Sequence, residues 1–227
     1  MFYKKSHIGI ALRLMKMMTT RDCCGSSSEI SRAKKELRPL AKSRLGSLTS
    51  EEKTRQSARI CRALLKEPLY VSARSISVYL NMKDEVGTMD IVKDAFRFNK
   101  KVYIPQYFIK PEASMNMVEL LGMEDLESLP KTSWHIKQPP SGENTHREIA
   151  KEIDLIIVPG LAFSLAGERL GRGMGFYDKY LSSLHQRPAT LALAFDVQIF
   201  EKLPTEAGRD FLVDKVLVGE RDGGGDS

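Results

Sequence analysis

Cysteine is scarce in this chain of 227 residues, which contains Cys23, Cys24 and Cys61 and no others. Three cysteines at this spacing cannot build a disulfide framework, and an adjacent pair with one distant partner does not form a zinc knuckle. No apolar run approaches the roughly 20 residues that a membrane-spanning helix needs. A hydrophobic fraction of 42% and a charged fraction of 28% are typical of soluble globular domains. We therefore expect free thiols in a reducing compartment and no membrane partner.

Acidic residues are absent from residues 1–21, which carry five of the six net positive charges of the chain. The remaining residues are almost neutral. A protein that binds nucleic acid through the phosphate backbone instead presents a basic face on its folded surface. We therefore expect no nucleic-acid partner and favour a function that acts on a small molecule. We also expect the protein to be a monomer.

Both ends of the chain differ in composition from the middle. Residues 1–28 are basic and rich in Met, and they end in a Gly-Ser-Ser-Ser run, whereas the last residues contain Gly-Gly-Gly. We predict a flexible basic N-terminal extension at 1–28, one α/β domain at 29–220 and a flexible tail at 221–227. The extension has the basic charge of a mitochondrial transit peptide but little Arg and no obvious cleavage site. A cytoplasmic location is our expectation, and a mitochondrial one is the alternative.

Residues 29–220 alternate between helical segments and β-prone runs. Helices are predicted at 28–44, 49–67, 88–99 and 176–184, with a kink or break near Arg38 because Pro39 follows it. Strands are predicted at 75–80, 101–105, 115–120, 154–158, 190–195 and 213–218. This alternation predicts a largely parallel sheet with helices on both faces. Ligands of such sheets bind beyond the carboxyl ends of the strands.

The stretch 154–181 carries the clearest chemical signal. A buried strand ends at Pro159-Gly160, and the following loop places two arginines among closely spaced glycines: Gly167, Arg169, Gly171, Arg172, Gly173 and Gly175. Glycines let backbone N–H groups face an anion, a helix N-terminus attracts negative charge, and guanidinium groups bind oxyanions. The loop lacks the GxxxxGK[ST] pattern, so it is not a Walker A site. It predicts phosphate binding of another kind.

Several single side chains leave alternatives open. Asp178 either holds Mg²⁺ beside ATP phosphates or simply complements the helix dipole. Asp214, at the start of a late strand, is a second metal contact or, more simply, a turn acid. Glu85 could accept a hydrogen bond from an amino-heterocycle, although a solvated turn is the simpler interpretation. Trp134 and Tyr107 could stack on a flat ligand or merely cover the core.

Taken together, these motifs resemble the 5-formyltetrahydrofolate cyclo-ligase family. The matching pieces extend from about residue 31 to residue 219 and occur in the same order: AKKELR, VYLNMKDEVGT, VYIPQY, LPKTSWHIKQP, VPGLAF, GERLGRGMGFYDKYL, TLALAF and VDKVL. The resemblance implies a three-layer α/β/α sandwich of the ribose-5-phosphate isomerase and CoA-transferase type. It also implies MgATP-dependent closure of 5-formyltetrahydrofolate to 5,10-methenyltetrahydrofolate, with release of ADP and phosphate.

The resemblance implies a role for each matching residue. Catalysis falls to Arg172, Gly173 and Tyr177. The ATP contacts are Lys34, Lys35, Arg38, Arg169, Gly171, Arg172, Gly173, Met174, Gly175, Phe176 and Tyr177. The folate contacts are Leu80, Glu85, Tyr107 and Trp134, together with Arg172, Gly173, Met174, Gly175 and Phe176. The magnesium ligands are Asp178 and Asp214.

The chain departs from the animal pattern at four positions. Gln106 replaces an Arg, which would remove a cation near the ligand mouth, and Ser164 replaces an Asp. Met174 and Phe176 stand where animal members read GKGYYD. Two other functions remain as alternatives: a sugar-phosphate isomerase or CoA-transferase relative, which would turn over without ATP, and a non-catalytic folate- or nucleotide-binding module.

Overall fold

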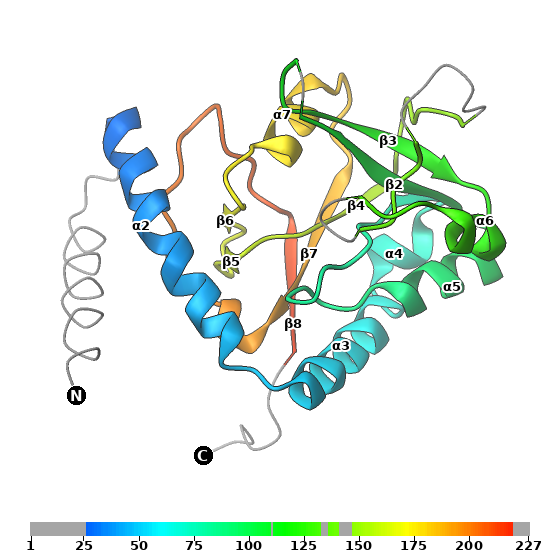
Figure 1. The fold of residues 1–227 in the computed structure, drawn as a ribbon, viewed down its shortest axis with the longest axis horizontal. Helices are drawn as coiled ribbons and strands as arrows, with labels where there is room; N and C mark the ends of the chain where they lie inside the picture. The colour runs from blue at the N-terminus through cyan, green and yellow to red at the C-terminus, as the bar shows by residue number, and fades with distance from the viewer. Residues whose placement is uncertain (1–25, 110, 133–135, 141–146, 220–227) are drawn as a thin grey trace.

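The computed structural model describes residues 26–109, 111–132, 136–140 and 147–219. Its centre is a mixed, mostly parallel six-stranded sheet in the order β3-β2-β1-β4-β7-β8 (Figure 1). The strands are β1 (Ser75–Ser77), β2 (Lys101–Phe108), β3 (Ser114–Leu120), β4 (Leu155–Val158), β7 (Ala189–Phe195) and β8 (Lys215–Gly219). All neighbouring pairs are parallel except β2 and β3. The predicted α/β class and the largely parallel sheet are confirmed.

Helices flank the sheet on its two faces. They are α2 (Ser27–Gly46), α3 (Ser50–Leu64), α4 (Pro68–Ser72), α5 (Met89–Arg97), α6 (Met123–Ser128) and α7 (Phe176–Ser183), with a short 3-10 turn, η1 (Asp196–Gln198). Figure 1 shows α3, α4 and α5 grouped together, with α7 apart from them. α2 runs beside β5 (Ala162–Phe163) and β6 (Arg169–Leu170), which form a small hairpin inside the Gly-rich stretch.

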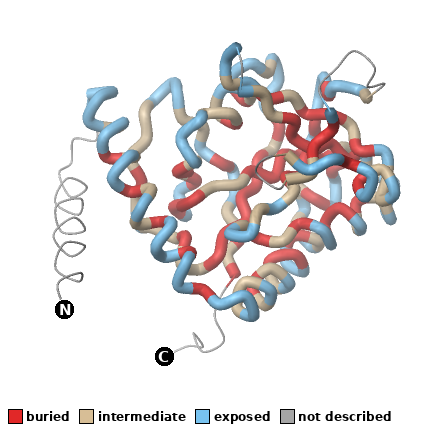
Figure 2. The backbone as a smooth tube through the Cα atoms, in the orientation of Figure 1, coloured by how far each residue is buried: buried red, intermediate tan, exposed pale blue. Residues whose placement is uncertain are grey.

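The alternating side chains of strand β4 show how both faces of the sheet are buried. Leu155 and Ile157 belong to the hydrophobic cluster formed with α3 and α5, whereas Ile156 and Val158 belong to the cluster formed with α7. Side chains of a strand point alternately to opposite faces, so a sheet covered on both sides needs a continuous apolar run. Figure 2 shows the resulting buried centre in red.

Three local features differ from the sequence prediction. α2 continues through Pro39 instead of breaking at Arg38. The apolar stripe that includes Leu37 and Ala41 is buried on either side of the proline, and this packing keeps the helix intact. β1 ends at Ser77 rather than Leu80, and β2 extends to Phe108.

Candidate active site

Two adjoining cavities lie where the loops after β1 and β4 meet the Gly-rich stretch. The first has a volume of about 270 Å³ and is lined by Tyr79, Leu80, Met82, Glu85, Tyr107, Ile136, Pro159, Gly160, Arg172, Met174, Phe176 and Tyr177. The second has a volume of about 620 Å³ and is lined by Ser31, Lys34, Arg38, Leu170, Gly173, Lys179, Ser182, Ser183, Glu206, Gly208, Arg209 and Asp210. Both cavities are also lined by Arg169, Gly171, Gly175 and Asp178, which form a shared wall.

The local fold of the Gly-rich stretch creates this shared wall. β5 and β6 pair as an antiparallel hairpin, and α7 begins directly after the loop. Gly175 caps α7 with a φ of 69°, in the left-handed region that glycine tolerates best. The N-terminus of α7, with its unpaired backbone N–H groups, therefore faces the cavities.

Arg169 is the buried centre of the wall. Its side chain is 5% exposed, and its Nη2 donates to Asp178 Oδ2 at 2.7 Å. Its Nη1 donates to the carbonyl of Pro159 at 3.3 Å. Among the described residues, its Nε is buried without a hydrogen-bond partner. The carboxylate and the carbonyl hold the guanidinium in place, so it supplies a fixed positive charge to both cavities.

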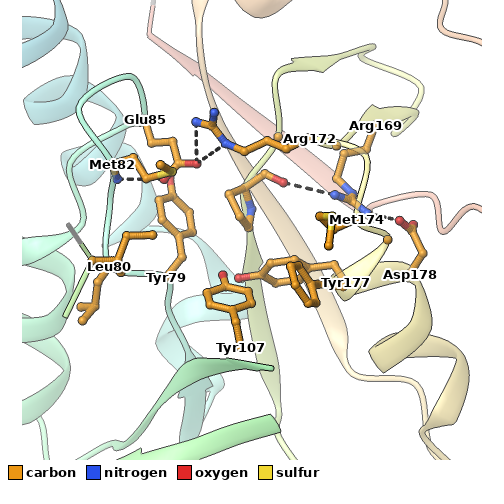
Figure 3. Close-up of a pocket in the computed structure, with 16 residues that line it drawn as sticks. Tyr79, Leu80, Met82, Glu85, Tyr107, Arg169, Arg172, Met174, Tyr177 and Asp178 are labelled. Atoms are coloured by element: carbon orange, nitrogen blue, oxygen red, sulfur yellow. Dashed lines mark hydrogen bonds and ion pairs between the residues drawn. The ribbon is translucent and has the colours of Figure 1, made fainter. Parts of the chain in front are cut away.

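Arg172 and Glu85 form an ion pair across the first cavity (Figure 3). Nε and Nη2 of Arg172 lie 3.3 and 3.2 Å from Glu85 Oε1, and Glu85 Oε2 accepts a hydrogen bond from the backbone N–H of Met82 at 2.9 Å. The Glu85 side chain is 10% exposed, whereas that of Arg172 is 39% exposed. Glu85 is thus an acceptor held by the Met82 N–H, and Arg172 is the more exposed partner.

Three tyrosines, Tyr79, Tyr107 and Tyr177, lie together at the base of the first cavity (Figure 3). Burial raises the pKa of each hydroxyl above its usual value, and the nearby carboxylate of Glu85 raises it further. All three therefore remain neutral at physiological pH. The Tyr107 ring packs against Phe176 with centroids 5.0 Å apart and planes tilted by 56°. This floor is apolar and aromatic, as a flat heterocycle requires.

The second cavity carries charged side chains. Lys34 pairs with Asp210, with Nζ to Oδ1 at 2.6 Å, and Asp210 Oδ2 also accepts from the backbone N–H of Glu206 at 2.6 Å. Arg38 Nε donates to the carbonyl of Gly171 at 3.0 Å and so ties α2 to the Gly-rich loop. The cations, the loop and the helix N-terminus together favour a polyphosphate.

The structure brings most predicted site residues to these cavities. Two of them lie elsewhere: Lys35 is exposed and lines neither cavity, and Asp214 lies at the amino-terminal end of β8. Asp214 Oδ2 accepts from the backbone N–H and hydroxyl of Thr190 at 2.8 and 2.7 Å, and its Oδ1 pairs with Arg187 at 2.9 Å. Its contacts are structural, so the structure does not bring it to Asp178. Trp134 lies outside the described residues.

Asp210 is an acid of the second cavity that sequence reasoning did not single out. It lines the second cavity together with Asp178, and the backbone N–H of the next residue, Phe211, donates to Asp178 Oδ1 at 3.3 Å. The sequence offered one signal for Asp210: it lies four residues before Asp214, in the segment that leads into a predicted strand. Sequence reasoning also missed Tyr79, which follows β1 into the first cavity.

Two of the departures from the animal pattern lie outside the cavities. Gln106 is buried, and its Nε2 donates to the carbonyls of Pro139 and Pro140 at 3.1 and 3.2 Å. Ser164 is buried in the turn of the β5–β6 hairpin, where its hydroxyl accepts from the backbone N–H of Glu168 at 3.2 Å. The Gln106 side chain lines neither cavity, although its neighbour Tyr107 lines the first, and the expected loss of a cation near the ligand mouth stays a prediction.

Comparison with known proteins identifies the kind of site. The model of the 5-formyltetrahydrofolate cyclo-ligase family matches residues 30–219. The chain belongs to this family. It is 41% identical over 193 residues to a mouse 5-formyltetrahydrofolate cyclo-ligase, an alignment covering 83% of this chain and 94% of the relative. It is 33% identical to a probable 5-formyltetrahydrofolate cyclo-ligase of Caenorhabditis elegans, with 84% and 94% covered.

A solved structure supports the same assignment. The NMR structure of Aquifex aeolicus 5,10-methenyltetrahydrofolate synthetase superposes with a TM-score of 0.66 at 27% identity, covering 83% of this chain and 90% of that chain. Among the described residues, no helix is both long enough and apolar enough to cross a membrane.

Proposed function

We propose that this family member binds its folate substrate in the first cavity and MgATP in the second, and that the two react where the cavities adjoin, beside the shared wall. The chain is an ATP-dependent ligase that converts 5-formyltetrahydrofolate to 5,10-methenyltetrahydrofolate. The observation that carries the proposal is that Arg169, Gly171, Gly175 and Asp178 line both cavities. Two reactants held in adjoining cavities that share lining residues can meet at the junction of the cavities and gain the advantage of proximity.

The first cavity suits the pterin. Its aromatic floor offers surface for a flat ring, and Glu85, which is 10% exposed, offers a fixed carboxylate for the ring's amino and N–H donors. A pterin that takes the Glu85 carboxylate displaces Arg172 from it. The released guanidinium then becomes available for the transferring phosphoryl group.

The second cavity suits the triphosphate. Lys34, Arg38 and Arg209 supply positive charge, and the loop from Gly171 to Gly175 supplies backbone N–H groups. Asp178 and Asp210 on the same cavity fit a magnesium ion that reaches the protein through one or two carboxylates and completes its shell with phosphate oxygens and water. The described residues contain no cluster of three His, Cys, Asp or Glu side chains that could hold a metal.

The chemistry is phosphoryl transfer followed by ring closure. The formyl oxygen attacks the γ-phosphorus, an oxygen–phosphorus bond forms, and the bond from the γ-phosphorus to ADP breaks. Nitrogen 10 of the folate then attacks the formyl carbon and loses its proton, while the carbon–oxygen bond breaks and inorganic phosphate leaves. Magnesium supplies charge neutralisation on the phosphates when it is bound.

The side chains of the wall position and stabilise this transfer. Arg169, held by Asp178, presents a fixed guanidinium to developing negative charge, and Arg172 approaches from the folate side. Preorganised donors of this kind act without reorganisation during the reaction. Tyr177 closes the floor beneath them as a neutral side chain, because burial raises the pKa of its hydroxyl.

The direct test follows the methenyl absorbance of purified protein mixed with 5-formyltetrahydrofolate and Mg²⁺, with ATP added last. We expect a rise that starts with ATP and that requires Mg²⁺. Turnover without ATP would favour the isomerase-like alternative, and nucleotide or folate binding without phosphate release would favour the non-catalytic module.

Three further predictions concern the whole chain. We expect a monomer, which light scattering after size exclusion tests, and a cytoplasmic location, which imaging of a fusion carried at the C-terminus tests. Removal of residues 1–25 should leave turnover intact, because the first described helix begins at Ser27 with Ser26 as its cap.

A further inference from the structure

The far end of strand β2 has an edge that no described strand covers. β1 pairs with β2 only as far as Tyr103, whereas β2 continues to Phe108. On its other edge β2 pairs with β3 throughout, with Tyr107 opposite Met115. The backbone groups of Tyr107 that point away from β3 therefore need partners from outside the sheet.

Gln138 supplies both partners with one side chain. The backbone N–H of Tyr107 donates to Gln138 Oε1 at 3.0 Å, and Gln138 Nε2 donates to the carbonyl of Tyr107 at 3.2 Å. The Gln138 residue is 9% exposed. Its amide group thus replaces the missing strand at one position and makes the two hydrogen bonds that a neighbouring strand would make.

The segment that carries Gln138 is itself anchored. The backbone N–H of Gln138 donates to the carbonyl of Pro130 at 3.0 Å. Lys137 Nζ donates to two carbonyls at the end of α6, at 2.9 Å each. Gln106, on β2, donates back to the carbonyls of Pro139 and Pro140. The two glutamines therefore join strand and segment reciprocally, each donating to the backbone of the other element.

Both joined elements end at the folate cavity. Tyr107 lines it from β2, Ile136 lines it from the segment just before Gln138, and the Tyr107 ring packs against Phe176 of the Gly-rich stretch. A shift of the end of β2 therefore moves the cavity's aromatic floor and one of its walls together. The second cavity has neither residue in its lining.

We propose that Gln138 is a positioning residue for the folate substrate, which acts through the backbone of Tyr107. The proposal rests on the assignment of the first cavity to folate. Its distinctive consequence is a selective effect: loss of the Gln138 amide impairs folate binding and leaves ATP binding unchanged.

The test compares Gln138→Met, which keeps the length but removes donor and acceptor, with Gln138→Glu, which keeps the acceptor. We expect the KM for 5-formyltetrahydrofolate to rise about tenfold in Gln138→Met, the range produced by leaving a buried hydrogen-bonding group without a partner. The KM for ATP and kcat should stay within about twofold. Gln138→Glu should show a smaller rise at pH 7 and recover as the pH falls, because a protonated carboxyl regains a donor for the Tyr107 carbonyl.

The matched control is Thr190→Val, a change of similar volume that removes the two hydrogen bonds between the Thr190 hydroxyl and Asp214 at the amino-terminal ends of β7 and β8. It should lower the Tm without a selective change in either KM. Equal rises of both KM values in Gln138→Met, or a folate KM no higher than in Thr190→Val, would overturn the proposal.

Equilibrium titration with 5-formyltetrahydrofolate separates this inference from the assignment of the cavity. If the wild-type protein binds 5-formyltetrahydrofolate and the Gln138→Met variant binds it about tenfold more weakly, the result supports both the folate assignment and the role of Gln138. Wild-type binding that is unchanged in the variant refutes the role of Gln138 alone, whereas no binding to wild type refutes the folate assignment and the inference with it. If Gln138→Met fails to fold, the pH-dependent recovery of Gln138→Glu decides.

Discussion

The ion pair between Arg169 and Asp178 provides the strongest test of the shared wall. Arg169→Met keeps much of the side-chain volume but removes the guanidinium, and it leaves a carboxylate that is 23% exposed without its cation. Breaking a fully buried pair costs about 3–5 kcal/mol. Asp178 keeps partial solvent contact and the backbone N–H of Phe211 at 3.3 Å, so we expect a loss of about 2–3 kcal/mol in the free energy of unfolding. For a domain of this size that corresponds to a fall in Tm of roughly 4–12 °C.

A second change tests whether the loss comes from the uncompensated charge. Asp178→Asn in the Arg169→Met background removes the orphaned carboxylate and should restore about 1 kcal/mol or more, as double-mutant cycles of contacting residues do. Turnover should remain low in both variants, because the reaction loses an oxyanion donor and a predicted metal ligand. Thermal unfolding followed by circular dichroism measures the stability, and ATP-dependent methenyl absorbance measures the turnover.

Two results would refute this reasoning. If the double variant is no more stable than Arg169→Met, the loss of stability does not come from the uncompensated carboxylate of Asp178. If Arg169→Met keeps nearly normal turnover with a lowered Tm, Arg169 stabilises the fold but does not contribute to the chemistry at the wall.

Three further predictions separate the site from its scaffold. Asp210→Asn should raise the Mg²⁺ concentration needed for half-maximal turnover at least about tenfold. Asp214→Asn should lower the Tm and leave that concentration unchanged. The reverse pattern would support Asp178 and Asp214 as the magnesium ligands, as the sequence resemblance implied. Glu85→Gln should raise the KM for 5-formyltetrahydrofolate by about 10–100-fold, since it weakens a hydrogen bond to a charged group, and initial rates at saturating ATP check this. Gly167→Ala should destabilise the fold by about 2–4 kcal/mol in urea unfolding, because the added Cβ lies 2.3 Å from the carbonyl oxygen of Val213 at a φ of 90°; an unchanged midpoint would contradict it.

Much of the scaffold was predictable because its signals are local. Apolar runs such as the one ending at Val158 marked buried strands, and Thr49 marked the start of α3, where its side chain accepts from the N–H of Glu52. The predicted break of the helix before Pro39 was wrong because it considered only the local effect of proline. The continuity of α2 depends on the packing of its buried apolar side chains along the whole helix. The end of β1 at Ser77 likewise depends on how β1 pairs with its neighbouring strands, and the β-propensity of one segment does not predict this pairing.

The functional site divides in the same way. The glycine and arginine spacing of residues 167–175 predicted an anion-binding loop beyond a buried strand, and the resemblance of several ordered motifs predicted the family. The sequence by itself therefore determined the loop, the fold class and the chemistry. Only the tertiary structure decided which acid joins Asp178, because Asp210 and Asp214 lie four residues apart and separate only when β8 pairs with β7. It also decided that Gln138 meets Tyr107, since a hydrogen bond between residues 31 positions apart depends on how the chain packs and not on any local pattern.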